Sequence, residues 1–476
     1  MVAPFPRLVS YLDTKPLKRF LIGLFVVAAG FAAVAGYAAA SAEREYRRLI
    51  AVGDAALARD DTFVAVEAFS GAIALRPDAM LAYLKRGQAY HRRGEFQNAR
   101  RDLRTASELD AASVRVFEAL GDVNYALKEY ERAADRYADC VRLDDTSGRL
   151  FYKLGLAQYQ AGHASAAIQP LGSAVALDGR NAEAQYVLGL ALRELGRTAD
   201  ALKALRAAIA FSPAFSEARA ELATIFRDLG RTRDEIEQLE ALAALGPRPE
   251  HAVALGLAYA KTGRTSQAVL TLGSAAERFP ETPQVYVALG RVWLESAEAR
   301  NDRIALSKAL EALEGALTTA DPSSEALALF GRALFVAGDL EAAEQTLLEA
   351  TARFPVEPSA FLYLADLSTR RGELARTRDA LVSYRALLAE DDPDGERLAP
   401  AARIADLSMR IDDPATGERW YRRASALNPS DARLLARLGE AAWAAGNRDA
   451  ARAAVTRAIG LRPDDYALRA LQRKFR

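Results

Sequence analysis

A strict period of thirty-four residues separates five glycines in the first half of the chain, Gly53, Gly87, Gly121, Gly155 and Gly189. Three other positions keep the same register. An alanine stands twelve residues after each glycine, a large residue sixteen after and a small residue nineteen after. A fixed period of this length is typical of proteins that repeat one small supersecondary unit along the chain. The sequence therefore predicts an elongated repeat architecture instead of one globular core.

Each period contains two amphipathic helical stretches, which we call helix A and helix B. Less regular copies of the unit follow at Ala223, Gly256, Gly290, Gly331, Ala365, Ala405 and Gly439. The period and the pattern resemble the tetratricopeptide repeat, a helix-turn-helix unit. The resemblance implies an all-α, right-handed superhelical solenoid of about twelve repeats over residues 46–465. Residues 466–476 are then expected to form a C-terminal capping helix.

The recurring glycines have two expected roles. A signature glycine such as Gly155 lies where helix A meets the large residue of helix B, and its missing side chain lets the two backbones approach. Gly94 and its equivalents lie in the turn between the two helices, where a left-handed backbone costs glycine little.

Two steps along the chain break the period. The step from Gly290 to Gly331 is longer by about seven residues, which lie between the two helices of repeat eight. The step from Ala365 to Ala405 is longer by about six, with the excess near "AEDDPDGERLAP". The acidic run there lacks the ligand alternation of an EF-hand, so we interpret it as a solvated turn. Its acidic residues are Asp391, Asp392, Asp394 and Glu396.

Residues 20–42 contain no charged side chain and include the run "FLIGLFVVAAGFAAVAGYAAA". A bilayer-spanning helix needs roughly 20 apolar residues, so the run predicts one transmembrane anchor behind a basic tail, residues 1–19. The Lys and Arg flanks slightly favour a cytoplasmic N-terminus, with the solenoid in the periplasm. A cleaved signal peptide is the alternative, because Ala40-Ser41-Ala42 offers a cleavage site. Small residues four apart on the anchor also allow a homo-oligomer through it.

Few residues are candidates for chemistry. Lys and Arg together number 63, as do Asp and Glu, so no net charge attracts nucleic acid. The single cysteine, Cys140, stands at a small position of repeat three, where a buried structural thiol is expected. The three histidines, His91, His163 and His251, share no metal-binding spacing. We therefore predict no catalytic residue, no metal and no cofactor.

Binding remains as the expected activity. The resemblance implies a concave groove lined by helix A positions six and three before, and one, four and five after, the signature residue. The candidate partner-binding residues at these positions are Tyr125, Tyr152, Leu156, Tyr159, Tyr186, Leu190 and Arg193. Aromatic and apolar side chains on such a face favour a peptide or partner helix. We expect the rings to face solvent when no partner is bound; the alternative is that they pack against adjacent helices.

The leading hypothesis is a non-enzymatic, membrane-anchored scaffold of the bacterial cell envelope that binds other proteins. It would lie in the cytoplasmic (inner) membrane. The composition, rich in Ala and Arg with few Lys, is typical of GC-rich bacterial genomes. Two alternatives stay open at this point: a secreted soluble adaptor, and an accessory subunit of a polysaccharide synthesis or export machinery, since similar repeats accompany such machinery.

Overall fold

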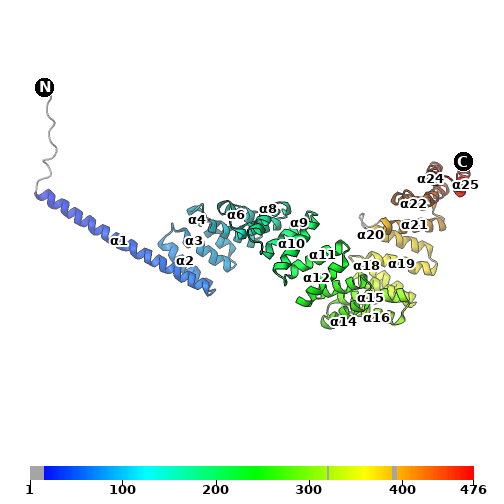
Figure 1. The fold of residues 1–476 in the computed structure, drawn as a ribbon, viewed down its shortest axis with the longest axis horizontal. Helices are drawn as coiled ribbons and strands as arrows, with labels where there is room; N and C mark the ends of the chain where they lie inside the picture. Colours follow the sequence, from blue (N-terminus) through cyan, green and yellow to red (C-terminus); the bar gives the residue numbers. More distant parts are fainter. Residues whose placement is uncertain (1–14, 319–320, 389–393) are drawn as a thin grey trace, which may run out of the picture. The chain divides into compact units, whose positions relative to one another are not determined.

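The computed structural model describes residues 15–318, 321–388 and 394–476, and within these ranges it contains 25 helices and no strand. The all-α prediction is confirmed. Contacts divide the chain into two units, Met1–Ile225 and Phe226–Arg476, which we describe separately. The order of the helices can be followed in Figure 1.

In the first unit each odd-numbered helix from α1 to α9 packs against the even-numbered helix that follows it, and this pair forms one repeat. The helices are α1 (Lys15–Ala58), α2 (Thr62–Leu75), α3 (Met80–Arg92), α4 (Phe96–Leu109), α5 (Val114–Ala126), α6 (Tyr130–Leu143), α7 (Gly148–Gln160), α8 (Ala164–Leu177), α9 (Ala182–Glu194), α10 (Thr198–Phe211) and α11 (Ser216–Asp228).

The second unit continues the same pairing from α13 onward, and α25 packs against α24. In the described ranges eleven such pairs are formed, and α11 and α12 stand in the sequence where repeat six is expected. The helices are α12 (Thr232–Leu245), α13 (Pro249–Lys261), α14 (Thr265–Arg278), α15 (Pro283–Arg300), α16 (Arg303–Ala316), α17 (Ser324–Ala337), α18 (Leu340–Ala352), α19 (Pro358–Arg371), α20 (Leu374–Leu387), α21 (Asp394–Arg410), α22 (Pro414–Leu427), α23 (Ala432–Ala444), α24 (Arg448–Leu461) and α25 (Tyr466–Lys474).

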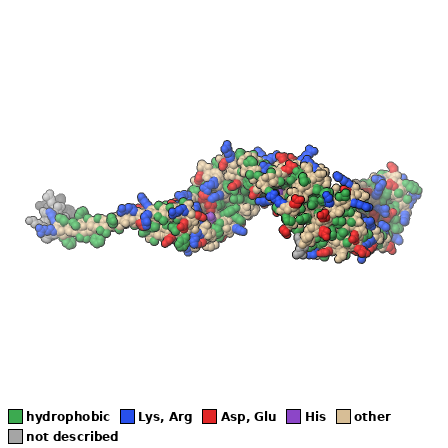
Figure 2. Space-filling model, turned by 90° about the horizontal axis from the view of Figure 1, so that it is seen from below, with side chains coloured by type: hydrophobic (Ala, Val, Ile, Leu, Met, Phe, Trp, Pro, Cys, Tyr) green, Lys and Arg blue, Asp and Glu red, His purple; other side chains and the backbone are tan. Residues whose placement is uncertain are grey.

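Helix α1 joins the predicted anchor to helix A of repeat one without a break. Its C-terminal part packs on α2, and Tyr46 is the first of its core residues, 7% exposed. Its N-terminal part projects from the repeats (Figure 1) and exposes 68% of Phe20 and 75% of Phe31. Charged side chains gather at the two ends of this projecting part, as Figure 2 shows. Among the described helices, α1 is the one long and apolar enough to cross a membrane.

The signature glycines occupy the closest contacts between helix A and helix B. A Cβ atom built at Gly155 would lie 2.5 Å from Cγ of Leu171, and one at Gly87 would lie 2.8 Å from Cγ of Leu103. Leu171 and Leu103 are the large residues sixteen positions later, and both are fully buried. The predicted register of the helix contact is therefore confirmed.

The turn between the two helices needs one left-handed residue. Gly94 has φ +75°, and the next residue, Glu95, donates its backbone N–H to the carbonyl of Tyr90 at 2.9 Å. This closes the helix end in the manner of a Schellman motif. Where the repeat lacks glycine, Lys128 and Asp412 still adopt φ 60° and 61°. The turn geometry is thus fixed by the repeat and not by the glycine alone.

The extra residues of the two irregular steps lengthen helices. In repeat eight, α15 has 18 residues against 13 in α13. Gly290 of α15 contacts Leu313, whereas in the regular repeats the signature glycine contacts the large residue sixteen positions later. The insertion is therefore mainly helical. In repeat eleven, helix α21 is also lengthened, to 17 residues, and begins at Asp394. Of the predicted acidic turn, Asp391 and Asp392 lie outside the described residues.

Candidate protein-interaction face

One face of every helix A carries the predicted binding positions. Residues six and three before, and one and four after, the signature residue follow the spacing of helical turns and therefore share this face. We call these positions the A-face. Tyr152 and Tyr186 stand three before their signature glycines, and Leu156 and Leu190 stand one after. The remaining candidates, four after, are Tyr125, Tyr159 and Arg193.

The structure brings four of these candidates into one apolar cluster. Tyr152, Leu156 and Tyr159 of α7 and Tyr186 of α9 pack against a buried core that includes Leu171 of α8. Tyr125 belongs to a separate cluster around Tyr137. The A-face of repeats four and five is therefore a continuous, mainly aromatic surface.

The tyrosine rings are not turned fully into solvent, contrary to the expectation from the sequence. All four are partly buried, and the ring centroid of Tyr186 lies 4.9 Å from that of Phe215 in the next repeat. Burial, with the negative charge of Glu183 adding to it, raises the pKa of Tyr152 to about 12. Burial also raises the pKa of Tyr125, Tyr159 and Tyr186. Each ring thus packs against neighbouring residues on one side and remains partly exposed on the A-face.

Arg193 and Leu190 complete the candidate set on α9. The Arg193 guanidinium forms an ion pair with Glu221 of α11, so its charge is already engaged between repeats five and six. Leu190 is partly buried one turn away from it. Arg193 therefore links α9 to α11 at the edge of the aromatic surface.

A charged network in repeats three and four also lies on this face, and the sequence analysis missed it. Lys153 Nζ lies 2.6 Å from carboxylate oxygens of both Glu118 and Asp122, and Tyr137 donates its hydroxyl to Asp122 at 2.7 Å. Burial alone would raise the pKa of Glu118, but hydrogen bonds from Arg149 and Lys153 hold it at about 2. Glu118 therefore stays ionised at neutral pH, and the network joins α5 to α7.

The spacing of this network recurs elsewhere on the A-face. A carboxylate one residue after a signature position pairs with a cation two residues before the next one. The pairs are Asp54 with Lys85 at 2.5 Å, Asp122 with Lys153 at 2.6 Å, and Asp366 with Arg403 at 3.5 Å. The sequence shows this recurrence as an acidic and a basic residue at a constant separation along the chain. The separation is wider only between Asp366 and Arg403, which lie across the longer step from Ala365 to Ala405.

Several cavities open on the A-face, and at three of them the residue three before the signature position is smaller than tyrosine. One of about 180 Å³ lies between Gln88, His91 and Asp122. A second, of about 470 Å³, is lined by Val253, Val287 and other residues of repeats seven to nine. A third lies between α23 and α25. The A-face of each unit therefore has room for a ligand at several places.

The family model described as "Tetratricopeptide repeat" matches the chain eight times, at residues 50–106, 92–147, 152–216, 193–251, 220–284, 253–325, 328–394 and 402–466. These matches cover most of the chain. The chain belongs to the tetratricopeptide repeat (TPR) family.

Solved structures of other proteins are similar to this one over differing shares of the chain. "YrrB: a TPR protein with an unusual peptide-binding site" is 24% identical, covers 40% of this chain and 97% of its own, with a TM-score of 0.36. MamA is 23% identical over 36% of this chain and 93% of its own, with a TM-score of 0.34. The APC/C hetero-tetramer Cut9-Hcn1 gives 11% identity over 90% of this chain and 96% of that one, with a TM-score of 0.38.

The single cysteine of this TPR protein lies in the core of repeat three. Cys140 is fully buried, and its thiol lies 3.5 Å from the carbonyl oxygen of Val114. Burial raises the pKa of Cys140 to about 12, so the nucleophilic thiolate is scarce at neutral pH. Across the described ranges, no group of three His, Cys, Asp or Glu side chains could hold a metal ion.

Proposed function

We propose that this TPR protein is a non-enzymatic, membrane-anchored scaffold of the bacterial cell envelope. In this proposal it lies in the inner membrane with its repeats in the periplasm. Partner proteins present a peptide or a helix to the A-face of repeats two to five.

The aromatic surface of repeats four and five carries the binding part of the proposal. Tyr152, Tyr159 and Tyr186 are held in place by packing, so little side-chain entropy remains to be lost when a partner binds. Their raised pKa values keep the hydroxyls protonated, so the rings offer apolar area together with hydrogen-bonding groups. Rigid tyrosines of this kind are frequent hot spots in protein interfaces.

The exposure of apolar side chains on the projecting part of α1 supports the proposal that this part is a membrane anchor. Between Phe20 and Tyr37 its large apolar side chains are mostly exposed, among them Phe25 at 73% and Tyr37 at 72%. Soluble monomers seldom expose a continuous apolar patch this large. A lipid bilayer would cover it, and a cleaved signal peptide would remove it.

The anchor is tested by expressing the full chain in a Gram-negative host. We expect the protein to stay in the membrane pellet after alkaline carbonate extraction, and a version with residues 43–476 alone to become extractable. Protease added to spheroplasts should digest the repeats while the N-terminus stays protected. A mature protein that begins after residue 40 and leaves the pellet would instead establish the signal peptide.

The binding surface is tested with two matched variants of the same apolar cluster. Tyr159→Ala removes an A-face ring, whereas Leu188→Ala removes a side chain of the cluster that lies off the A-face. Both should lower stability to a similar extent. We expect only Tyr159→Ala to lose the partner that the wild type retains from solubilised membranes. Equal loss from both variants would mean that the rings act through packing alone.

A further inference from the structure

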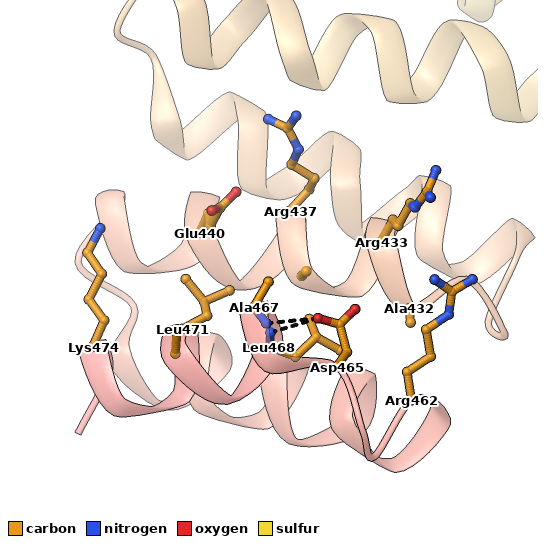
Figure 3. Close-up of a pocket in the computed structure, with 12 residues that line it drawn as sticks. Ala432, Arg433, Arg437, Glu440, Arg462, Asp465, Ala467, Leu468, Leu471 and Lys474 are labelled. Atoms are coloured by element: carbon orange, nitrogen blue, oxygen red, sulfur yellow. Dashed lines mark hydrogen bonds between the residues drawn. The ribbon is translucent and has the colours of Figure 1, made fainter.

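An A-face cavity of about 600 Å³ lies between α23 and α25 (Figure 3). Arg433, Ala436 and Glu440 line it from α23, at the positions six and three before and one after Gly439. On α25, Ala467, Ala470 and Lys474 line it one full period later. The cavity therefore lies at the A-face positions that hold the tyrosines in repeats four and five, but different residues occupy these positions here.

The cavity is open because small residues replace the tyrosines. Tyr152 and Tyr186 stand three residues before their signature glycines, and their rings cover this level of the A-face. Ala436 stands at the equivalent position of α23, and Ala470 of α25. Leu468 and Leu471 add an apolar floor next to them. The space that a ring fills in the first unit is thus available to a ligand in the second.

Four cations surround this apolar floor. Arg433 and Arg437 project from α23, while Arg462 caps the C-terminus of α24 and Lys474 is the last residue of α25 (Figure 3). In the described part of the chain, none of the four has a carboxylate within ion-pairing distance. Of the two acids at the cavity, Asp465 caps α25 by accepting from the backbone N–H groups of Ala467 and Leu468, at 2.9 and 3.3 Å. The rim therefore carries an excess of positive charge.

Arg437 departs from the pairing found elsewhere on this face. It stands two residues before Gly439, the position whose cation pairs with an acid of the preceding repeat elsewhere on the A-face. The acid at the matching place is Asp406, one residue after Ala405. Asp406 instead accepts the hydroxyl of Tyr421. In repeat three the corresponding Asp122 binds both Tyr137 and Lys153, whereas here the cation is left without its carboxylate.

We propose that this cavity binds an acidic peptide segment of a partner protein, at a second site distinct from the tyrosine surface. Carboxylates of the segment pair with Arg433 and Arg437 along α23, with Arg462 at the end of α24 and with Lys474 at the end of α25. Small apolar side chains between the acids lie on the floor of Ala436, Leu468 and Leu471. Guanidinium groups suit this role because they bind carboxylates in a bidentate manner.

The test uses the full chain in detergent and a short fluorescein-labelled peptide of alternating glutamate and alanine. The neutral control peptide carries glutamine in place of glutamate. Fluorescence anisotropy should show binding of the acidic peptide, weakened by added salt, and no binding of the neutral one. The paired substitution Arg433→Gln and Arg437→Gln should weaken binding by at least about tenfold, as expected for interface hot spots.

Two further variants separate the cavity from general charge attraction. Arg233→Gln with Arg457→Gln removes the same charge from exposed positions outside the cavity and should leave affinity unchanged. Ala436→Tyr restores the ring found in repeats four and five without changing charge, and should abolish binding. Equal losses from the two charge-removing pairs, unchanged binding by Ala436→Tyr, or full competition by phosphatidylglycerol vesicles would each overturn the proposal. Because Tyr159→Ala leaves this cavity intact, failure of either site can be recognised independently.

Discussion

Exchanging two glycines of repeat four for alanine should change stability in opposite directions. Gly155 lies in α7 at the contact with α8, and Gly172 lies within α8 itself. Both are interior helical positions, so alanine gains about 0.8–1 kcal/mol of helix propensity at each. The difference between the two variants then depends only on what the added methyl group meets.

At Gly155 the methyl group has no space. Its carbon would lie 2.5 Å from Cγ and 2.9 Å from Cδ2 of Leu171, and 3.2 Å from the backbone nitrogen of that residue. Leu171 is 0% exposed, so it cannot move aside into solvent. Overpacking of this kind costs about 1–3 kcal/mol, so after the propensity gain is subtracted a net loss of up to about 2 kcal/mol remains. At Gly172 nothing lies within 4 Å of the added carbon, so the propensity gain remains.

Urea unfolding followed by circular dichroism measures the two changes, and hydrogen exchange locates them. Exchange should accelerate in α7 and α8 for Gly155→Ala, because repeats are stabilised mainly by their neighbours. In a Leu171→Ala background the Gly155→Ala change should no longer destabilise. A stabilising effect of Gly155→Ala in the wild type would refute the assigned helix contact.

Three further substitutions test individual interactions. Glu118 has a pKa of about 2 against the ordinary 4.5, so its ionised form stabilises the fold above pH 4.5, and this stabilisation is lost as the pH falls towards 2. At 1.36 kcal/mol per pKa unit the wild type should lose about 3 kcal/mol of unfolding free energy over this range. Urea titrations at several pH values should show that Glu118→Gln lacks this loss. Asp102 is buried and binds Arg86 at 2.6 and 2.9 Å. Asp102→Ala leaves that cation unpaired and should lower the unfolding free energy by about 3–5 kcal/mol. An unfolding free energy equal to that of the wild type would contradict the burial of the pair. Lys128 is exposed with φ 60°, so Lys128→Gly should raise the unfolding free energy by about 0.5–1 kcal/mol, whereas a decrease would mean that the turn does not need a left-handed residue.

The sequence predicts the fold well because the repeat constrains the same few contacts many times. The spacing of Gly155 and Leu171 is enough to place one helix against the next, and Gly94 is enough to locate the turn. The helical form of the insertion in repeat eight was not predictable in this way. Residues that leave the register have no second copy to compare with, and the lengthened α15 depends on local helix formation.

The surface was less predictable than the core. Register identifies which residues share the A-face, but the exposure of a side chain there depends on its neighbours in the adjacent repeat. Tyr186 packs on Phe215, which is why its ring is partly buried. Likewise, the register places Arg437 opposite Asp406, and only the three-dimensional arrangement reveals that Asp406 accepts the Tyr421 hydroxyl without also forming an ion pair with Arg437.

Site-specific photo-crosslinking in intact membranes tests the central proposal most directly. A benzophenone amino acid at Tyr159 should crosslink a defined partner, whereas the same group at Lys203, exposed on helix B of the next repeat, should not. After carbonate extraction has removed uncrosslinked material, the crosslinked species should remain in the membrane pellet. A partner captured from Lys203 and not from Tyr159 would contradict the claim that this face of the repeats binds proteins.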